Sequence, residues 1–101
     1  MDNEQLVTRI RAGENVAENM LQLWQQNKGF IAKLAKKYRG YAEMDDLMQE
    51  GYIGLCNAVD KYDLEADYKF LTCASFHIRR AMILFVLRSR SVKIPEEWNT
   101  K

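Results

Sequence analysis

Cationic and aromatic side chains are mixed over a short stretch in the C-terminal half of the chain. They are Tyr68, Lys69, Phe70, Phe76, His77, Arg79 and Arg80. Cations neutralise phosphates and aromatic faces stack on unpaired bases, so this mixture favours binding to single-stranded nucleic acid. The alternative is that Phe70 and Phe76 are core residues and that the arginines form a solvated face. Composition alone does not separate these two interpretations.

The charges are segregated along the chain, although its 101 residues have a formal net charge of only +1. Residues 41–67 carry eight acidic side chains and one lysine, whereas residues 68–95 carry six basic side chains and no acidic one. Adjacent blocks of opposite sign predict charged partners of opposite sign. A hydrophobic content of 48% argues against intrinsic disorder, and the length predicts one small domain.

Catalytic and metal-binding chemistry finds little support in the sequence. Cys56 and Cys73 lack the clustered ligands of a zinc site, so we expect reduced thiols in a cytosolic protein, with no metal and no cofactor. Cys73 lies one helical turn before His77, but no third group is apparent that would orient a nucleophile pair. The four carboxylates between residues 60 and 67 lack the glycine and the terminal glutamate of a calcium loop. We therefore expect a binding protein and not an enzyme.

Few helix breakers interrupt the chain, which predicts an all-α fold. It has one proline and five glycines among many helix-favouring residues. We expect a compact bundle of about five helices, of which the first three end near Gly13, Gly29 and Gly40. The longest apolar run, residues 81–87, is too short to span a bilayer, so no membrane partner is expected.

The fourth expected helix has two distinct faces. It begins at Asp46, which has the capping-box spacing to Gln49. Gly51 and Gly54 lie on its packing face, and two glycines there predict the close approach of another helix. The opposite face is exposed and mostly polar, and its members are Asp46, Gln49, Glu50, Ile53 and Asn57.

A loop over residues 63–69 leads to the fifth expected helix, roughly residues 73–90, with Thr72 as its N-cap. The inward stripe of this helix is Ala74, Ile78, Ala81, Met82 and Phe85. Residues 82–87 are apolar on every side, so either the helix is central or part of the run meets something outside this chain. Pro95 makes the following segment extended.

Three strings of residues in this region resemble a known family. They are DDLMQEGYIGLCNAVDKYD, YKFLTCASFHIRRAM and SRSVKIP, and together they resemble the second region of bacterial sigma factors of the sigma-70 family. The match spans about residues 28–95, with a weaker likeness over residues 1–27. The resemblance implies a helical domain over residues 1–95, followed by a tail or linker over residues 96–101.

Members of this family are promoter-recognition subunits of RNA polymerase, and the resemblance assigns two binding surfaces. One helix docks on the coiled coil of the beta-prime clamp, and another helix with its preceding loop opens the −10 element and captures non-template bases. By position, the polymerase-binding residues are Asp46, Gln49, Glu50, Tyr52 and Cys56. The DNA-binding residues are Tyr68, Lys69, Phe70, Thr72, Phe76, His77, Arg79, Arg80 and Ile83.

The chain departs from the family pattern at the positions that stack on bases. Primary sigma factors carry Tyr where this chain has Cys73, and a Trp pair where it has Phe76 and His77. Smaller aromatic faces for stacking predict weak melting of promoter DNA and a preference for a non-consensus −10 sequence, as in an alternative sigma factor. They also favour a rival function, in which the protein docks on polymerase as a regulator or decoy without opening promoters.

The resemblance covers only part of the family's length. The fourth region, a helix-turn-helix that reads the −35 element, has no counterpart here. The chain is therefore expected to be either a fragment of a longer factor or a factor reduced to this domain. An anti-sigma factor is a further partner that the resemblance allows, and the expected location is the cytoplasm.

Overall fold

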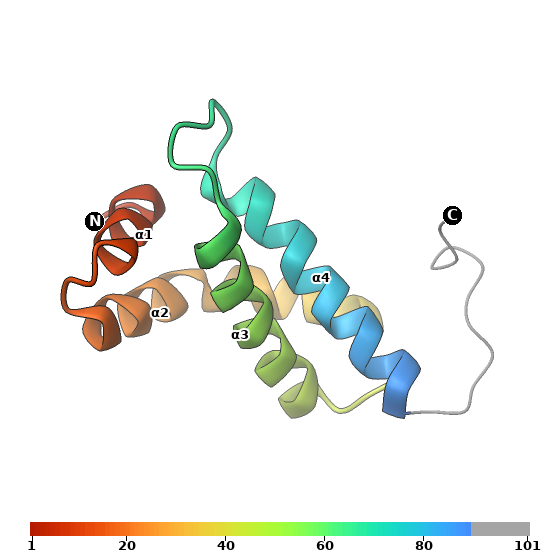
Figure 1. The fold of residues 1–101 in the computed structure, drawn as a ribbon. Helices are drawn as coiled ribbons and strands as arrows, with labels where there is room; N and C mark the ends of the chain where they lie inside the picture. The colour runs from red at the N-terminus through yellow and green to blue at the C-terminus, as the bar shows by residue number, and fades with distance from the viewer. Residues whose placement is uncertain (90–101) are drawn as a thin grey trace.

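A computed structural model describes residues 1–89, and within this range the chain is all-α, as predicted (Figure 1). The helices are α1 (Asn3–Arg11), α2 (Val16–Ala35), the short 3-10 helix η1 (Lys36–Tyr38), α3 (Met44–Lys61) and α4 (Phe70–Ser89). α3 and α4 form an antiparallel pair that packs along its length, and α2 crosses behind it (Figure 1). The expected extended segment at Pro95 and the tail over residues 96–101 lie outside the described residues.

The prediction of about five helices is slightly off, because residues 1–89 form four α-helices and the short η1, and the second and third expected helices are one. Gly29 lies inside α2 and does not end it. A glycine in a helix interior costs about 1 kcal/mol relative to alanine. The buried stripe of Leu23, Asn27, Ile31 and Leu34 continues through this point, so burial on both sides of Gly29 outweighs the cost. The chain turns only after Ala35, in η1.

The expected starts of the last two helices are also wrong. α3 begins at Met44, so Asp46 lies in its first turn and not at its N-cap, where its charge still favours the helix dipole. α4 begins at Phe70, which places Thr72 inside the helix. The capping box of this fold lies instead at α1. There Asp2 accepts a hydrogen bond from the Gln5 backbone N–H at 2.8 Å, and the Gln5 side chain accepts one from Asp2.

The close approach predicted from the two glycines of α3 is confirmed. A Cβ atom on Gly54 would lie 2.6 Å from the Ile78 Cα and 2.7 Å from the His77 carbonyl oxygen. A Cβ on Gly51 would lie 2.5 Å from Cγ2 of Ile31 on α2. The backbones of α3 and α4 therefore meet at Gly54 with no side chain between them.

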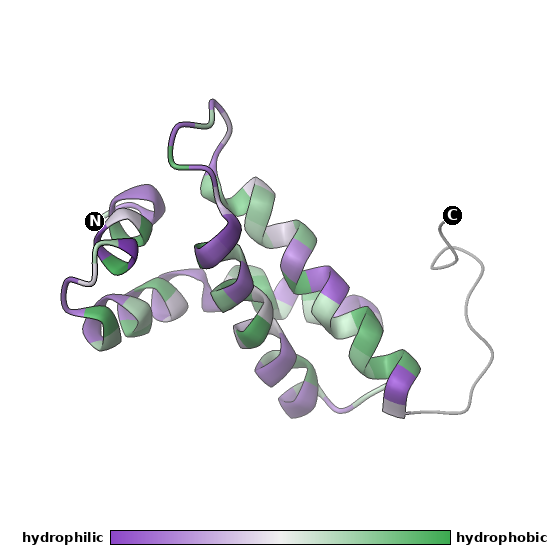
Figure 2. Ribbon diagram, in the orientation of Figure 1, coloured by the Kyte–Doolittle hydropathy of each residue, from purple (hydrophilic) through white to green (hydrophobic). Residues whose placement is uncertain are grey.

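The buried stripe of α4 differs from the predicted one. It follows every fourth residue, namely Phe70, Ala74, Ile78, Met82 and Val86. Ala81 and Phe85, which were expected to face inward, are only partly buried. Because four residues exceed one helical turn, the stripe moves around the helix by about 40° at each step. The second half of α4 is also coloured as mostly apolar, in agreement with the apolar run over residues 82–87 (Figure 2).

By length and composition alone, α4 could cross a membrane. Two features of its environment point to a core helix of a folded domain. Arg79 and Arg80 are exposed near its middle, where charge in a bilayer is most costly. Its stripe from Phe70 to Val86 is buried against the other helices.

Candidate protein- and nucleic-acid-binding surfaces

The outer face of α3 presents the first three residues assigned to polymerase binding. Asp46, Gln49 and Glu50 follow the three-to-four spacing of one helix face. Asp46 and Gln49 are exposed and Glu50 is half-buried, and Ile53 continues the same face with 48% of its surface exposed. We call Asp46, Gln49, Glu50 and Ile53 the acidic face. A carboxylate-bearing helix face of this kind suits a basic partner, because charge-assisted hydrogen bonds are stronger than neutral ones.

An aromatic pair borders the acidic face. The Tyr52 ring packs edge-on against the Trp24 ring of α2, with the centroids 5.4 Å apart. Tyr52 is 40% exposed, and its hydroxyl shares a hydrogen bond with Cys56 one turn later. The charge of a Cys56 thiolate, this hydrogen bond and burial raise the pKa of Tyr52, and burial chiefly raises the pKa of the Cys56 thiol. Both groups are therefore neutral near pH 7. The sequence reasoning missed Trp24, because only the fold brings α2 beside Tyr52.

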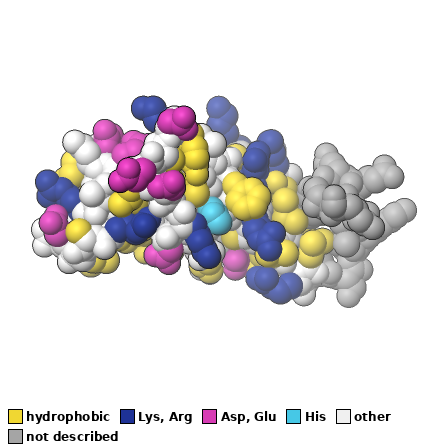
Figure 3. Space-filling view, turned by 45° about the horizontal axis from the view of Figure 1, so that its top comes forward, with side chains coloured by type: hydrophobic (Ala, Val, Ile, Leu, Met, Phe, Trp, Pro, Cys, Tyr) yellow, Lys and Arg dark blue, Asp and Glu magenta, His cyan; other side chains and the backbone are white. Residues whose placement is uncertain are grey.

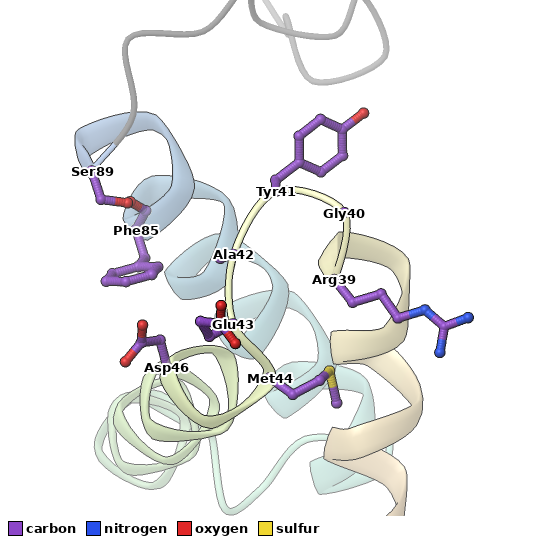
Figure 4. A pocket seen from close by; sticks show the side chains of 9 residues that line it. All are labelled: Arg39, Gly40, Tyr41, Ala42, Glu43, Met44, Asp46, Phe85 and Ser89. Carbon is purple, nitrogen blue, oxygen red and sulfur yellow. The ribbon is translucent and has the colours of Figure 1, made fainter.

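A cavity of about 550 Å³ adjoins the acidic face at the end of the bundle. It lies between the η1–α3 connection and the last turns of α4. Its lining residues are Arg39, Gly40, Tyr41, Ala42, Glu43, Met44, Asp46, Phe85 and Ser89. Asp46 and Phe85 lie toward one another, and Arg39 points to the opposite side (Figure 4). A carboxylate beside an aromatic ring is a suitable environment for a cationic side chain.

The outer face of α4 collects most of the residues assigned to DNA. Thr72, Phe76, Arg79, Arg80 and Ile83 follow three-to-four spacing, so they share one side of the helix. The first four are exposed, Phe76 with 56% of its surface, and Ile83 is partly buried. We call these five residues the basic aromatic face. Basic and hydrophobic side chains surround the chain's single histidine on this side of the molecule (Figure 3).

His77 borders the basic aromatic face and is partly buried. Its ring packs edge-on against the Phe76 ring, with the centroids 5.2 Å apart. Burial lowers the pKa of His77, and the cations Lys61 and Arg80 lower it further. The imidazole is therefore neutral at pH 7. It adds a ring to this surface, and it adds charge only in acid.

The pKa shift of Cys73 does not favour the thiolate that a nucleophile pair with His77 would need. Burial raises the pKa of the Cys73 thiol, while burial and nearby cations lower that of His77. Both shifts favour the neutral thiol and the neutral imidazole, whereas nucleophilic cysteine chemistry requires the thiolate. Among residues 1–89, no group of three or more His, Cys, Asp or Glu side chains could hold a metal ion.

Aromatic rings in edge-on contact support the loop before α4. Tyr68 is 46% exposed, Lys69 is exposed, and Phe70 has no exposed surface. The buried Tyr62 ring packs edge-on against both Tyr68 and Phe70, and its hydroxyl donates a 2.7 Å hydrogen bond to the Tyr68 carbonyl. Phe70 therefore presents no ring face to a base in this structure and instead supports the loop.

Two charged residues of α1 contact the ends of this loop, and the sequence reasoning missed both. A Glu4 carboxylate oxygen accepts a hydrogen bond from the Phe70 backbone N–H at 2.7 Å. Arg11 donates to the carbonyl oxygens of Val59 at 3.0 Å and Tyr62 at 2.7 Å. These partners are 48 to 66 positions apart in sequence, so no local pattern could have indicated them.

The described residues form a small all-α domain whose last two helices carry the acidic face and the basic aromatic face. Residues 23–92 match the Sigma-70 region 2 family, which is more than half of the chain. The chain therefore belongs to the sigma-70 region 2 family, and the resemblance stated from the sequence is confirmed. It is 37% identical over 90 residues to the RNA polymerase sigma factor SigA of Nostoc sp. and 38% identical over 90 residues to SigA of Microcystis aeruginosa.

These relatives are much longer than the chain. The alignments cover 86% of this chain but only 22% of the Nostoc protein and 21% of the Microcystis protein. SigA1 of Synechococcus elongatus gives 37% identity with the same coverage as the Nostoc protein. The chain thus spans about a fifth of the length of these curated relatives.

Proposed function

We propose that the chain is a transcription initiation domain that binds RNA polymerase through α3 and promoter DNA through α4. The supporting observation is that an antiparallel helix pair carries an acidic face on one helix and a basic aromatic face on the other. Two partners of opposite charge can then bind the same small domain at once. Membership of the sigma-70 region 2 family supports RNA polymerase and promoter DNA as the two partners, and we propose the polymerase clamp and the −10 element as the parts that are bound.

On the polymerase side, the proposed contacts are Asp46, Gln49, Glu50, Tyr52 and Cys56. The acidic face would meet basic side chains of the beta-prime clamp coiled coil, with Tyr52 packing on the apolar parts of that helix. The cavity beside Asp46 and Phe85 has room for a cationic side chain of the partner. The domain is expected in the cytoplasm with the polymerase, and an anti-sigma factor is a further partner that the resemblance allows.

On the DNA side, Lys69 and Arg79 would hold phosphates of the non-template strand, and Arg80 with Ile83 would meet the upstream base pair of the −10 element. Tyr68 and Phe76 are the exposed rings available for stacking on unpaired bases, with His77 beside them. Thr72 and Ile83 complete the surface at its two ends. We expect Phe70 to contribute indirectly, because its buried ring packs on Tyr62, and Tyr62 in turn packs on Tyr68 and fixes its position.

A second function has a specific observation in its favour. Phe70 is buried, and Cys73 lies at a position where primary sigma factors carry Tyr, so the surface has few ring faces with which to hold flipped bases. Such a domain could dock on polymerase as a regulator or decoy without opening promoters. Flipping a base costs a few kcal/mol, which stacking and pocket contacts must repay.

Abortive transcription separates these two functions. Purified core polymerase, the protein and a supercoiled template carrying a −10 element would be assayed for short RNA products. Initiation predicts products that depend on the protein and disappear when Arg79 and Arg80 are both replaced by alanine. Binding to core polymerase without any products would support the decoy.

A further inference from the structure

α1 holds both ends of the loop formed by residues 62–69, which connects α3 to α4. Glu4 and Arg11 are seven positions apart, so they lie on the same side of α1. Glu4 binds the first backbone N–H of α4, at Phe70. Arg11 binds the carbonyl oxygens of Val59 and Tyr62 at the end of α3.

Both contacts satisfy backbone groups that a helix cannot satisfy by itself. The first N–H groups and the last carbonyl groups of a helix have no partner within it. A carboxylate at the N-terminus of α4 and a guanidinium at the C-terminus of α3 also have the signs that the two helix dipoles favour. Because each of these hydrogen bonds includes a charged group, it is stronger than a neutral one.

α1 is in turn fixed to α2 through side-chain amides. Asn3 and Asn27 exchange hydrogen bonds of 3.2 and 2.7 Å, and Gln26 donates to Asn3 at 2.8 Å. Asn27 is buried and also donates to the Leu23 carbonyl, so the amide network is part of the interior. The loop is thereby tied to α2, and its position does not depend on α3 and α4 alone.

From these contacts we propose that α1 is a brace, with Glu4 and Arg11 as positioning residues that set the nucleic-acid-binding loop. This inference rests on the function proposed for α4. The braced loop carries Tyr68 and Lys69, whereas the acidic face begins at the other end of α3. The brace therefore acts on binding of single-stranded DNA and leaves polymerase binding unchanged.

The test uses the full chain and its Glu4→Ala, Glu4→Gln, Arg11→Ala and Arg11→Lys variants. Glu14→Ala and Arg9→Ala are matched controls, because they remove the same charges at exposed positions near or on α1. DNA affinity is measured by fluorescence anisotropy with a single-stranded oligonucleotide of the non-template −10 sequence. Core polymerase binding is measured in parallel, and amide hydrogen exchange is followed at residues 59–70.

For Glu4, the sign of the effect separates a brace from simple electrostatics. Removing a carboxylate should strengthen binding to a polyanion, and Glu14→Ala is expected to do so slightly. The brace predicts instead that Glu4→Ala weakens DNA binding by about tenfold, the loss of one charge-assisted hydrogen bond. Glu4→Gln keeps an acceptor oxygen and is expected to recover most of this affinity. Exchange of the Phe70 amide should be faster in Glu4→Ala than in Glu4→Gln.

For Arg11, the comparison is with Arg9. Both Arg11→Ala and Arg9→Ala remove one positive charge, but only Arg11→Ala should speed exchange in the loop and weaken binding beyond the common electrostatic loss. Arg11→Lys should lie between Arg11→Ala and the parent chain. Equal behaviour of the two alanine variants would count against the brace.

Two further outcomes would overturn the proposal. One is faster loop exchange in Glu4→Ala with unchanged or tighter DNA binding. The other is a parallel loss of DNA and polymerase binding, which would mean that α1 stabilises the whole domain. If the parent chain binds no single-stranded DNA, the proposed function fails. The hydrogen-exchange measurement still tests the brace in that case, because faster amide exchange confined to residues 59–70 in Glu4→Ala would show that Glu4 positions the loop.

Discussion

Gly54 of α3 and Ile78 of α4 are in backbone contact, so that a Cβ atom on Gly54 would lie 2.6 Å from the Ile78 Cα. Backbone atoms cannot move aside as the end of a flexible side chain can. The position therefore requires glycine because of its neighbour and not because of its own backbone conformation, which is helical. Gly54 is therefore the position at which a side chain would separate α3 from α4.

Gly54→Ala is expected to destabilise the domain by about 3 kcal/mol, the upper end of the usual cost of overpacking. The matched control is Gly29→Ala, because Gly29 is also inside a helix but a Cβ there meets nothing within 4 Å. That change is expected to stabilise by up to about 1 kcal/mol. Urea unfolding of both variants measures the two free energies, and equal effects would contradict the packing described here.

Glu50→Arg is expected to abolish association with core RNA polymerase while leaving the fold intact. It reverses a charge in the middle of the acidic face, where a basic partner would then meet a cation. Asp60→Arg is the control, since it makes the same reversal near the other end of α3. A pull-down with core enzyme and a thermal melt are sufficient, and unchanged retention of Glu50→Arg would refute the assignment of this face.

Arg79→Ala is expected to weaken binding to single-stranded −10 DNA and to make that binding less sensitive to salt. One lost phosphate contact should reduce the slope of log affinity against log salt by about 0.7. Arg88→Ala removes the same charge from an exposed position on another side of α4 and should change the slope less. Titrations at several salt concentrations give both slopes, and identical slopes would place the DNA elsewhere.

His77 is expected to make the stability of the fold depend on pH. Burial and the cations Lys61 and Arg80 lower its pKa in the folded state below the ordinary value of 6.5. The unfolded chain therefore binds a proton more readily, so stability is complete above about pH 6.5 and is lost as pH falls through the lowered folded-state pKa. Thermal midpoints between pH 7.5 and 5 should fall less in His77→Gln than in the parent chain. A fall of the same size in both proteins would assign the effect to other groups.

Patterns within single helices could be predicted from the sequence. Periodic polar positions placed Asp46, Gln49 and Glu50 on one outer face, and the glycines of α3 predicted the close approach of another helix, which the structure shows to be α4. Long-range contacts could not be predicted. α4 begins at Phe70, earlier than predicted, and the carboxylate of Glu4, 66 positions away in sequence, accepts a hydrogen bond from its first N–H group. The burial of Phe70 follows from its packing on Tyr62. α2 continues through Gly29 because its neighbouring residues are buried against other helices. A prediction that ends a helix at each glycine does not take this burial into account.

The every-fourth-residue spacing of α4 has a consequence for the direction of the strand in the DNA complex that we propose. The exposed positions Thr72, Phe76 and Arg80 repeat with the same interval as the buried residues, so they too follow a row inclined by about 26° to the helix axis. A strand whose bases and phosphates meet this row in sequence would cross α4 obliquely and not run parallel to it. Successive nucleotides would then leave the helix on the side of Arg80, away from the braced loop.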